Sequence, residues 1–186
     1  MKVIQCKQGD IYLINFEKLA RPIINDNIGL ALITQNDVGN HFSPTTIVAP
    51  IIEKHKVESY NVSIKLPNFR YKDSNEYYVL LDAQYTIDKK SRFLEKVSSI
   101  SNEDLNIIIA QALKVINPAA SDPISSSISN LETFIKNHSK KDFKECYEEM
   151  IKTEQLKVKS ICEKYDICFN EYNSKFDKII EFVNKL

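Results

Sequence analysis

Two short apolar runs joined by a longer polar segment constrain this sequence more than any other feature. Leu30–Ile33 and Thr46–Ala49 are partly β-branched and are bounded by turn-forming residues, which is typical of buried strands. Between them, Asn36-Asp37 and Gly39-Asn40 tolerate left-handed backbone angles, and Ser43-Pro44 favours an extended entry into the second run. The pattern predicts two buried strands connected by a long loop, and it contains no catalytic group by itself.

The rest of the chain predicts a β-rich part followed by a helical part. After a helix predicted over about Asn102–Ile116, Pro and Ser replace the periodic apolar residues in Asn117–Ser129. From there to Leu186, apolar residues recur every three or four positions, the spacing of amphipathic helices. We predict an α+β protein with a small, strongly curved β-barrel domain over residues 1–117, a linker over 118–130 and a helical extension over 131–186. The predicted strands are Asp10–Phe16, Gly29–Gln35, Thr45–Ile52, Tyr60–Lys65 and Tyr77–Leu81.

The composition of the chain limits the kinds of partner, compartment and bound group that we expect for it. The chain of 186 residues has 25 basic and 25 acidic side chains, so contact with a nucleic acid must come from a local patch and not from the field of the whole protein. No long apolar run and no signal-peptide pattern occurs, which predicts a cytoplasmic protein without a membrane span. The four cysteines have no metal-ligand spacing, and we expect reduced thiols, no metal and no cofactor.

The polar segment and its flanks carry a family resemblance. Gln-Asn-Asp-Val-Gly-Asn-His-Phe-Ser-Pro-Thr-Thr-Ile-Val-Ala, residues 35–49, resembles the core motif of the MazF/PemK family of toxin endoribonucleases. Gly9–Tyr12 resembles the opening strand of that family, Thr86–Lys89 its late strand-to-helix turn, and Ser101–Leu105 the start of its closing helix. The resemblance extends from about Gly9 to Ile116. It implies an SH3-like barrel of the CcdB/PemK/MazF type, a homodimer, and metal-independent cleavage of single-stranded RNA by the toxin of a type II toxin–antitoxin pair.

The resemblance also implies where the chemistry should lie. The family uses an arginine at the head of the second strand and a threonine or serine at the far end of the third. In-line attack by a 2′-hydroxyl needs proton transfer and fixed positive charge at the phosphate. Aligned on Gln35, the arginine position falls on Gly29 and the hydroxyl position on Ile52, so neither group carries over. A basic residue that often precedes Thr86 in the family is Tyr85 here.

Two residues are candidate catalytic substitutes. Arg21 stands in an Arg-Pro dipeptide between the first two predicted strands and would supply charge to the phosphate. His55, between Lys54 and Lys56, would transfer protons, although a histidine in such a setting is more often solvated surface. Candidate contacts to RNA or to a partner are His41, Ser43, Thr45, Lys54 and Tyr85.

Two functions therefore stay open. The first is an endoribonuclease with rearranged catalytic groups. The second is a catalytically inactive member of the family that binds RNA or a protein. The helical extension either packs on itself or on the barrel, extends a dimer interface, or occupies the groove in which an antitoxin-like peptide binds.

Overall fold

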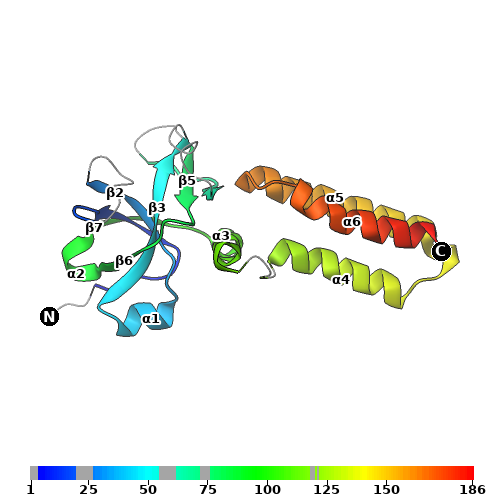
Figure 1. Ribbon diagram of the computed structural model, residues 1–186, viewed down its shortest axis with the longest axis horizontal. Helices are drawn as coiled ribbons and strands as arrows, with labels where there is room; N and C mark the ends of the chain where they lie inside the picture. The colour runs from blue at the N-terminus through cyan, green and yellow to red at the C-terminus, as the bar shows by residue number, and fades with distance from the viewer. Residues whose placement is uncertain (1–3, 20–26, 55–61, 72–75, 118–119, 121) are drawn as a thin grey trace. The chain divides into compact units, whose positions relative to one another are not determined.

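The computed structural model describes residues 4–19, 27–54, 62–71, 76–117, 120 and 122–186. The chain divides into two compact units, Met1–Pro118 (unit 1) and Ala119–Leu186 (unit 2). Figure 1 shows a sheet with helices in unit 1 and helices alone in unit 2. Within the described residues, no helix combines the length and the apolar composition that crossing a membrane requires.

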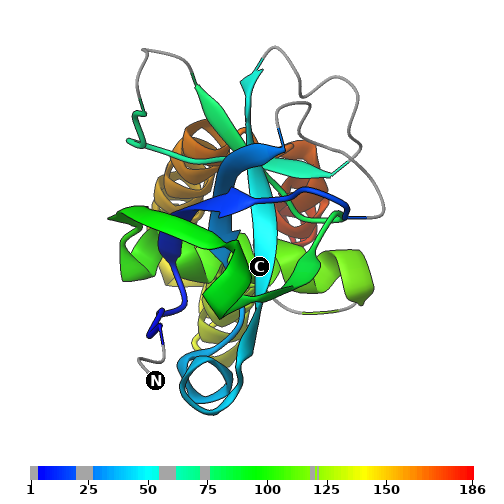
Figure 2. The ribbon, with the colours of Figure 1, turned by 90° about the vertical axis from the view of Figure 1, so that its left-hand side faces the viewer.

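Unit 1 is built on an antiparallel sheet with the order β4-β5-β3-β2-β1-β7. The edge of β3 that faces away from β2 is shared by two strands, β6 beside its first half and β5 beside its end. The ladder therefore forks at β3 and does not close on itself in the described part of the chain, so the expected barrel is an open, curved sheet. Figure 2 shows this curvature. The elements are β1 Asp10–Asn15, β2 Ile28–Ile33, α1 Asp37–Phe42, β3 Thr45–Glu53, β4 Ser63–Lys65, β5 Tyr77–Leu80, β6 Tyr85–Asp88, α2 Lys89–Arg92, β7 Phe93–Ser99 and α3 Asn102–Ile116.

The predicted strands agree with β1, β2, β3 and β5 to within two residues at each end, and the predicted helix is α3. The strand predicted from Tyr60 begins at Ser63 in the described residues. Of the other elements, β6 and α2 were anticipated only as the strand-to-helix turn that Thr86–Lys89 resembles, and α1 and β7 were missed. The segment predicted as a loop contains α1, because Asn36 caps the amide of Gly39 and starts a helical turn. β7 has mostly exposed side chains, and it pairs with β1 without the apolar alternation that marks a strand in a sequence.

The interior of unit 1 comes from the predicted apolar runs. Ile11, Ile14, Leu32, Ile33 and Val48 are all buried. β2 lies between β1 and β3, with Leu32 opposite Ile11 and Leu30 opposite Ile51. Burial on both sides explains why β2 reads as a continuous apolar run and not as an alternating one.

Unit 2 consists of α4 Pro123–Asn137, the 3-10 turn η2 Lys141–Phe143, α5 Lys144–Tyr165 and α6 Asn170–Asn184. The linker predicted over 118–130 is wrong from residue 123 onward, because α4 begins there. Asp122 caps the amide of Ser125, and Pro123 occupies the first turn, where its missing N–H costs nothing. Ile124, Ile128 and Ile135 then form the buried face of α4.

The apolar faces of the three helices of unit 2 cover one another. Tyr147, Ile151 and Tyr165 of α5 and Tyr172 and Phe176 of α6 are buried together with the face of α4. The extension therefore packs on itself, one of the alternatives left open by the sequence. Phe143, at the start of the predicted apolar face, is exposed instead.

Candidate functional site

The motif after β2 positions α1 through a buried polar network. Asn40 is buried, its side-chain amide donates to the carbonyl of Gln35 over 2.8 Å, and its side-chain oxygen accepts from Thr46 Oγ1 at 2.6 Å. Lys89 is only 2% exposed, and its Nζ donates to the carbonyl of Asn40 over 2.6 Å. A buried ammonium needs such a partner. The most recognisable residues of the sequence thus hold α1, β3 and α2 together.

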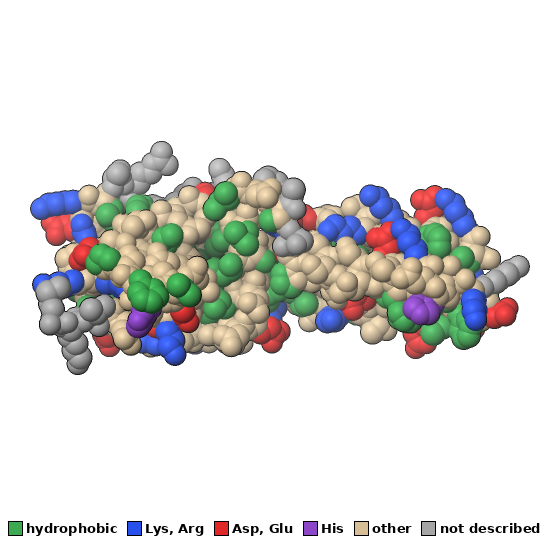
Figure 3. Space-filling view, turned by 90° about the horizontal axis from the view of Figure 1, so that it is seen from below, with side chains coloured by type: hydrophobic (Ala, Val, Ile, Leu, Met, Phe, Trp, Pro, Cys, Tyr) green, Lys and Arg blue, Asp and Glu red, His purple; other side chains and the backbone are tan. Residues whose placement is uncertain are grey.

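Three of the candidate contact residues, His41, Ser43 and Thr45, lie together where α1 leads into the start of β3. The hydroxyls of Ser43 and Thr45 are 2.9 Å apart, and the Thr45 amide donates to Ser43 Oγ over 3.1 Å. His41 is exposed, with its ring edge-on to Phe42. Hydrophobic side chains are exposed on the same helix at Val38 and Phe42, and Figure 3 shows such side chains on one face of unit 1.

A polar pocket of about 350 Å³ lies beside His41. Its walls include Asp10 and Lys96, whose carboxylate and ammonium form an ion pair at 2.7 Å. Burial by itself raises the pKa of Asp10, but hydrogen bonds from Lys96, the Lys7 amide and Ser99 outweigh it and lower that pKa. Asp10 is therefore a charged, fully bonded group that joins β1 to β7, and it is unsuited to act as a base. Cys6, also in the wall, is a thiol whose pKa is raised by burial.

The two positions where the resemblance places catalysis lie at the opposite end of β3, Ile52 in β3 itself and Gly29 in the neighbouring β2. Gly29 pairs with Ile14, and since Leu30 pairs with Ile51, the next step of the same register sets Gly29 across from Ile52. Ile52 is 5% exposed and packs in an apolar cluster with Tyr78, Leu80 and Ala83. The two positions are neighbours in the fold, but one has no side chain and the other belongs to the core.

Charged groups stand beside this apolar cluster. Glu76 accepts hydrogen bonds from Lys54 Nζ, over 2.7 Å, and from Lys65 Nζ. The bonds from Lys54 and Lys65 lower the pKa of Glu76 to about 2. Lys65 and Glu76 were missed by the sequence analysis, because only the pairing of β3, β4 and β5 brings them next to Lys54.

The remaining candidates do not complete one site. Tyr85 lies in β6 opposite Val48, and its ring packs edge-on against Phe16 at the edge of the core. Thr45 and Lys54 are at opposite ends of β3, about 30 Å apart along the strand. Arg21 and His55 lie outside the described residues. The structure therefore separates His41, Ser43 and Thr45 from Lys54, and no metal-binding group of three or more His, Cys, Asp or Glu residues occurs in the part that it describes.

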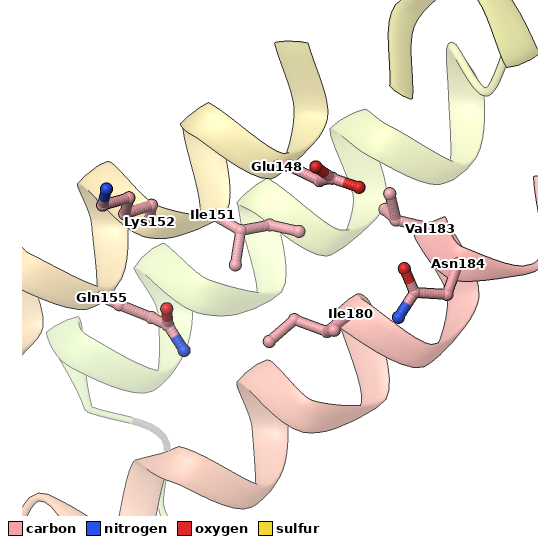
Figure 4. A pocket seen from close by; sticks show the side chains of 7 residues that line it. All are labelled: Glu148, Ile151, Lys152, Gln155, Ile180, Val183 and Asn184. Atoms are coloured by element: carbon pink, nitrogen blue, oxygen red, sulfur yellow. The ribbon is translucent and has the colours of Figure 1, made fainter. Parts of the chain in front are cut away.

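Unit 2 has a small pocket of its own, about 200 Å³, between α5 and α6. Ile151, Ile180 and Val183 form its apolar lining, with Glu148 and Lys152 among its polar residues, as Figure 4 shows. No cluster of titratable groups in it suggests catalysis. The four cysteines are free thiols, two of which, Cys146 and Cys168, are exposed.

Comparison with known proteins identifies the family. A model of the family described as "PemK-like, MazF-like toxin of type II toxin-antitoxin system" matches residues 7–116. The chain belongs to this family. The PemK/MazF match includes the apolar strands, the motif and α3, and it ends before unit 2.

One curated relative agrees with this assignment in sequence. Endoribonuclease EndoA of Bacillus subtilis (strain 168) is 32% identical over 99 residues, which are 52% of this chain and 82% of that protein. Among solved structures, an endoribonuclease in complex with its cognate antitoxin from Mycobacterial species is 15% identical, with a TM-score of 0.41 over 62% of this chain and 93% of that one. The Mycobacterium tuberculosis toxin MazF-mt6 is also 15% identical, with a TM-score of 0.44 over 57% of this chain and 93% of that one.

Proposed function

We propose that this protein is the toxin-type component of a type II toxin–antitoxin pair, and that it binds single-stranded RNA without cleaving it at the family's catalytic positions. One observation carries the proposal. Ile52, at the position of the family's hydroxyl, is buried against Tyr78 and Leu80, and the position of the family's arginine is Gly29, which directly precedes Leu30, the partner of Ile51.

The chemistry of RNA cleavage explains why the residues at these two positions matter. Cleavage by in-line attack needs a group that transfers protons and a cation that stabilises charge on the phosphorane. Loss of one donor that stabilises the developing charge typically costs about 2.7–4 kcal/mol of transition-state stabilisation. Neither group is present at Gly29 or Ile52, the two positions that the family uses, and this favours binding over turnover at those positions. The proposal includes the partners that the family implies, a second copy of the chain and an antitoxin-like peptide.

The test uses the full-length protein and a long RNA of mixed sequence. We expect the RNA to bind to the protein on a filter and to stay intact on a gel in the presence of a chelator. The double variant Gly29→Arg/Ile52→Thr should gain cleavage that resists the chelator, whereas Gly29→Lys/Ile52→Val, with a charge but neither a guanidinium nor a hydroxyl, should not. Robust cleavage by the unmodified protein would overturn the proposal.

Such cleavage would favour a second function, RNA hydrolysis with rearranged groups. Its support is the position of His55, which directly follows Lys54 beyond the end of β3. In that case His55→Ala should remove the activity and Arg21→Ala should weaken it. RNA cleavage that survives both substitutions would exclude this mechanism.

A further inference from the structure

Five residues lie together at the end of β3: Ile52, Tyr78 and Lys65 on three strands, and Lys54 and Glu76 just beyond the ends of β3 and β5. Ile52 pairs with Tyr78, and Tyr78 pairs with Lys65 on its other side, so these side chains form a row across β3, β5 and β4. Lys54 and Glu76 continue the pairing one step further, since the Lys54 amide donates to the carbonyl of Glu76 over 2.8 Å. The side chain of Glu76 bonds both to Lys54 and to Lys65 of the first row, which places the charged groups on the same side. The Cα atoms of Lys54 and Lys65 thus lie within about 7 and 10 Å of that of Ile52.

The charges of this group do not balance. Lys54 and Lys65 both bond to Glu76, which leaves a net charge of one positive unit in a chain whose formal charge is zero. The side chains are 65%, 28% and 33% exposed for Lys54, Lys65 and Glu76, so solvent and ligands reach them. Two lysine side chains therefore lie at the same end of the sheet as Gly29.

The geometry of the bonds suggests the ligand. Glu76 presents one carboxylate oxygen to each ammonium group, with Oε2 toward Lys54 and Oε1 toward Lys65. A phosphodiester has two non-bridging oxygens on one atom and a full negative charge, so it can take the same position between the two ammonium groups. The carboxylate offsets the repulsion between the two ammonium groups and holds both of them around one position.

We propose that Lys54 and Lys65 bind a backbone phosphate of single-stranded RNA, and that Glu76 positions them and is displaced by that phosphate. This inference rests on the RNA binding proposed above and assigns it to particular residues. The alternative is that the three charges only tie β3, β4 and β5 together. The two roles differ in sign, because removing the charge of Glu76 strengthens phosphate binding in the first and only weakens the sheet in the second.

The test measures binding of a fluorescent single-stranded RNA by anisotropy over a range of salt concentrations. The slope of log K against log salt reports the number of phosphates contacted, at about 0.7 per contact for a single strand. Lys54→Gln and Lys65→Gln should each reduce the slope by about 0.7 to 1 and weaken binding equally for different RNA sequences. Glu76→Gln should raise the affinity at low salt.

Matched controls come from exposed ion pairs in unit 2. Lys136→Gln and Glu181→Gln change the net charge by the same amounts, in the pairs of Lys136 with Glu132 and of Glu181 with Lys185, and should leave the slope unchanged. Lys54→Gln is the decisive variant, since that side chain is the most exposed of the three and its loss is compatible with folding.

The outcomes separate this inference from the proposed function. If the unmodified protein binds RNA and Lys54→Gln has an unchanged slope, the assignment to this lysine pair is wrong while RNA binding stands. If Glu76→Gln weakens binding while hydrogen exchange of the β3 amides shows an intact sheet, displacement of Glu76 is wrong. If the unmodified protein does not bind RNA, the proposed function itself fails.

Discussion

Replacing Ile52 with threonine restores the hydroxyl at the family's catalytic position, and we predict that it destabilises unit 1. Ile52 is 5% exposed, and its neighbours Tyr78 and Leu80 are buried as well. Shortening a buried isoleucine to the size of valine costs about 0.5–1.5 kcal/mol. Burying a hydroxyl without a partner adds about 1–3 kcal/mol. The expected loss in the free energy of unfolding is therefore about 1.5–4.5 kcal/mol.

The assay is hydrogen exchange of the β3 amides as a function of urea, which reports on unit 1 separately from the helical unit. Ile52→Val is the matched control, because it removes the same methylene without adding the hydroxyl, and it should lose only about 0.5–1.5 kcal/mol. The difference between the two variants isolates the cost of the buried hydroxyl.

Equal stabilities of the two variants would refute the reasoning. They would mean that a hydroxyl at position 52 finds water or a bonding partner, so that this position is still polar and accessible. A clear difference would mean that a hydroxyl at position 52 is stranded in the core, and that the packing of Ile52 stabilises the fold where the family has a polar group.

Three further predictions concern the charged groups. Glu76 should titrate with a pKa of about 2 instead of the usual 4.5, because lysine ammonium groups bond to its charged form. The contribution of Glu76 to stability is then present above pH 4.5 and is lost as the pH falls toward 2. A midpoint near 4.5 in a carbon NMR titration of the Glu76 carboxylate would contradict this prediction. Asp10→Asn should lower the free energy of unfolding of unit 1 by about 1.5–3 kcal/mol at neutral pH, the worth of hydrogen bonds to a charged group. Since the pKa of Asp10 is lowered in the folded protein, this loss should shrink in acid, and urea unfolding that shows an equal loss in acid would contradict it. Asp122→Ala removes the cap of α4 and should destabilise unit 2 by about 0.5–2 kcal/mol. Amide hydrogen exchange should then become faster in α4 and stay unchanged in β3. Slower or unchanged exchange in α4 would refute the capping role of Asp122.

Most of the sheet of unit 1 could be predicted because its strands carry their own signal. The run at Leu30–Ile33 is apolar since both faces of β2 are buried there, and the run at Thr46–Ala49 is buried except at Ile47. β7 carries no such signal, because its side chains are largely exposed and its place is set by bonding to β1. The segment that starts α4 was predicted to be a linker because it is rich in serine. The burial of Asp122 and Ile128, which marks it as a packed helix, is apparent only in the structure.

The candidate site was predicted in part. The alignment on Gln35 located Gly29 and Ile52, and with them the loss of the expected catalytic groups, without any coordinates. That these positions are neighbours follows from the register of β2 and β3. Glu76 had no feature in the sequence that distinguished it from other surface carboxylates, and it became a candidate only through its bonds to two lysines.

The sequence alone determined the family, the strands with buried faces, and which side chains are absent from the two positions where the family's catalytic groups belong. These properties depend on local pattern and on residue identity, which a linear chain displays directly. The tertiary structure alone decided that the sheet stays open, that Ile52 is core, and that Lys54, Lys65 and Glu76 form one group. These depend on strand register, and a shift of a single residue would turn each of these side chains to the other face.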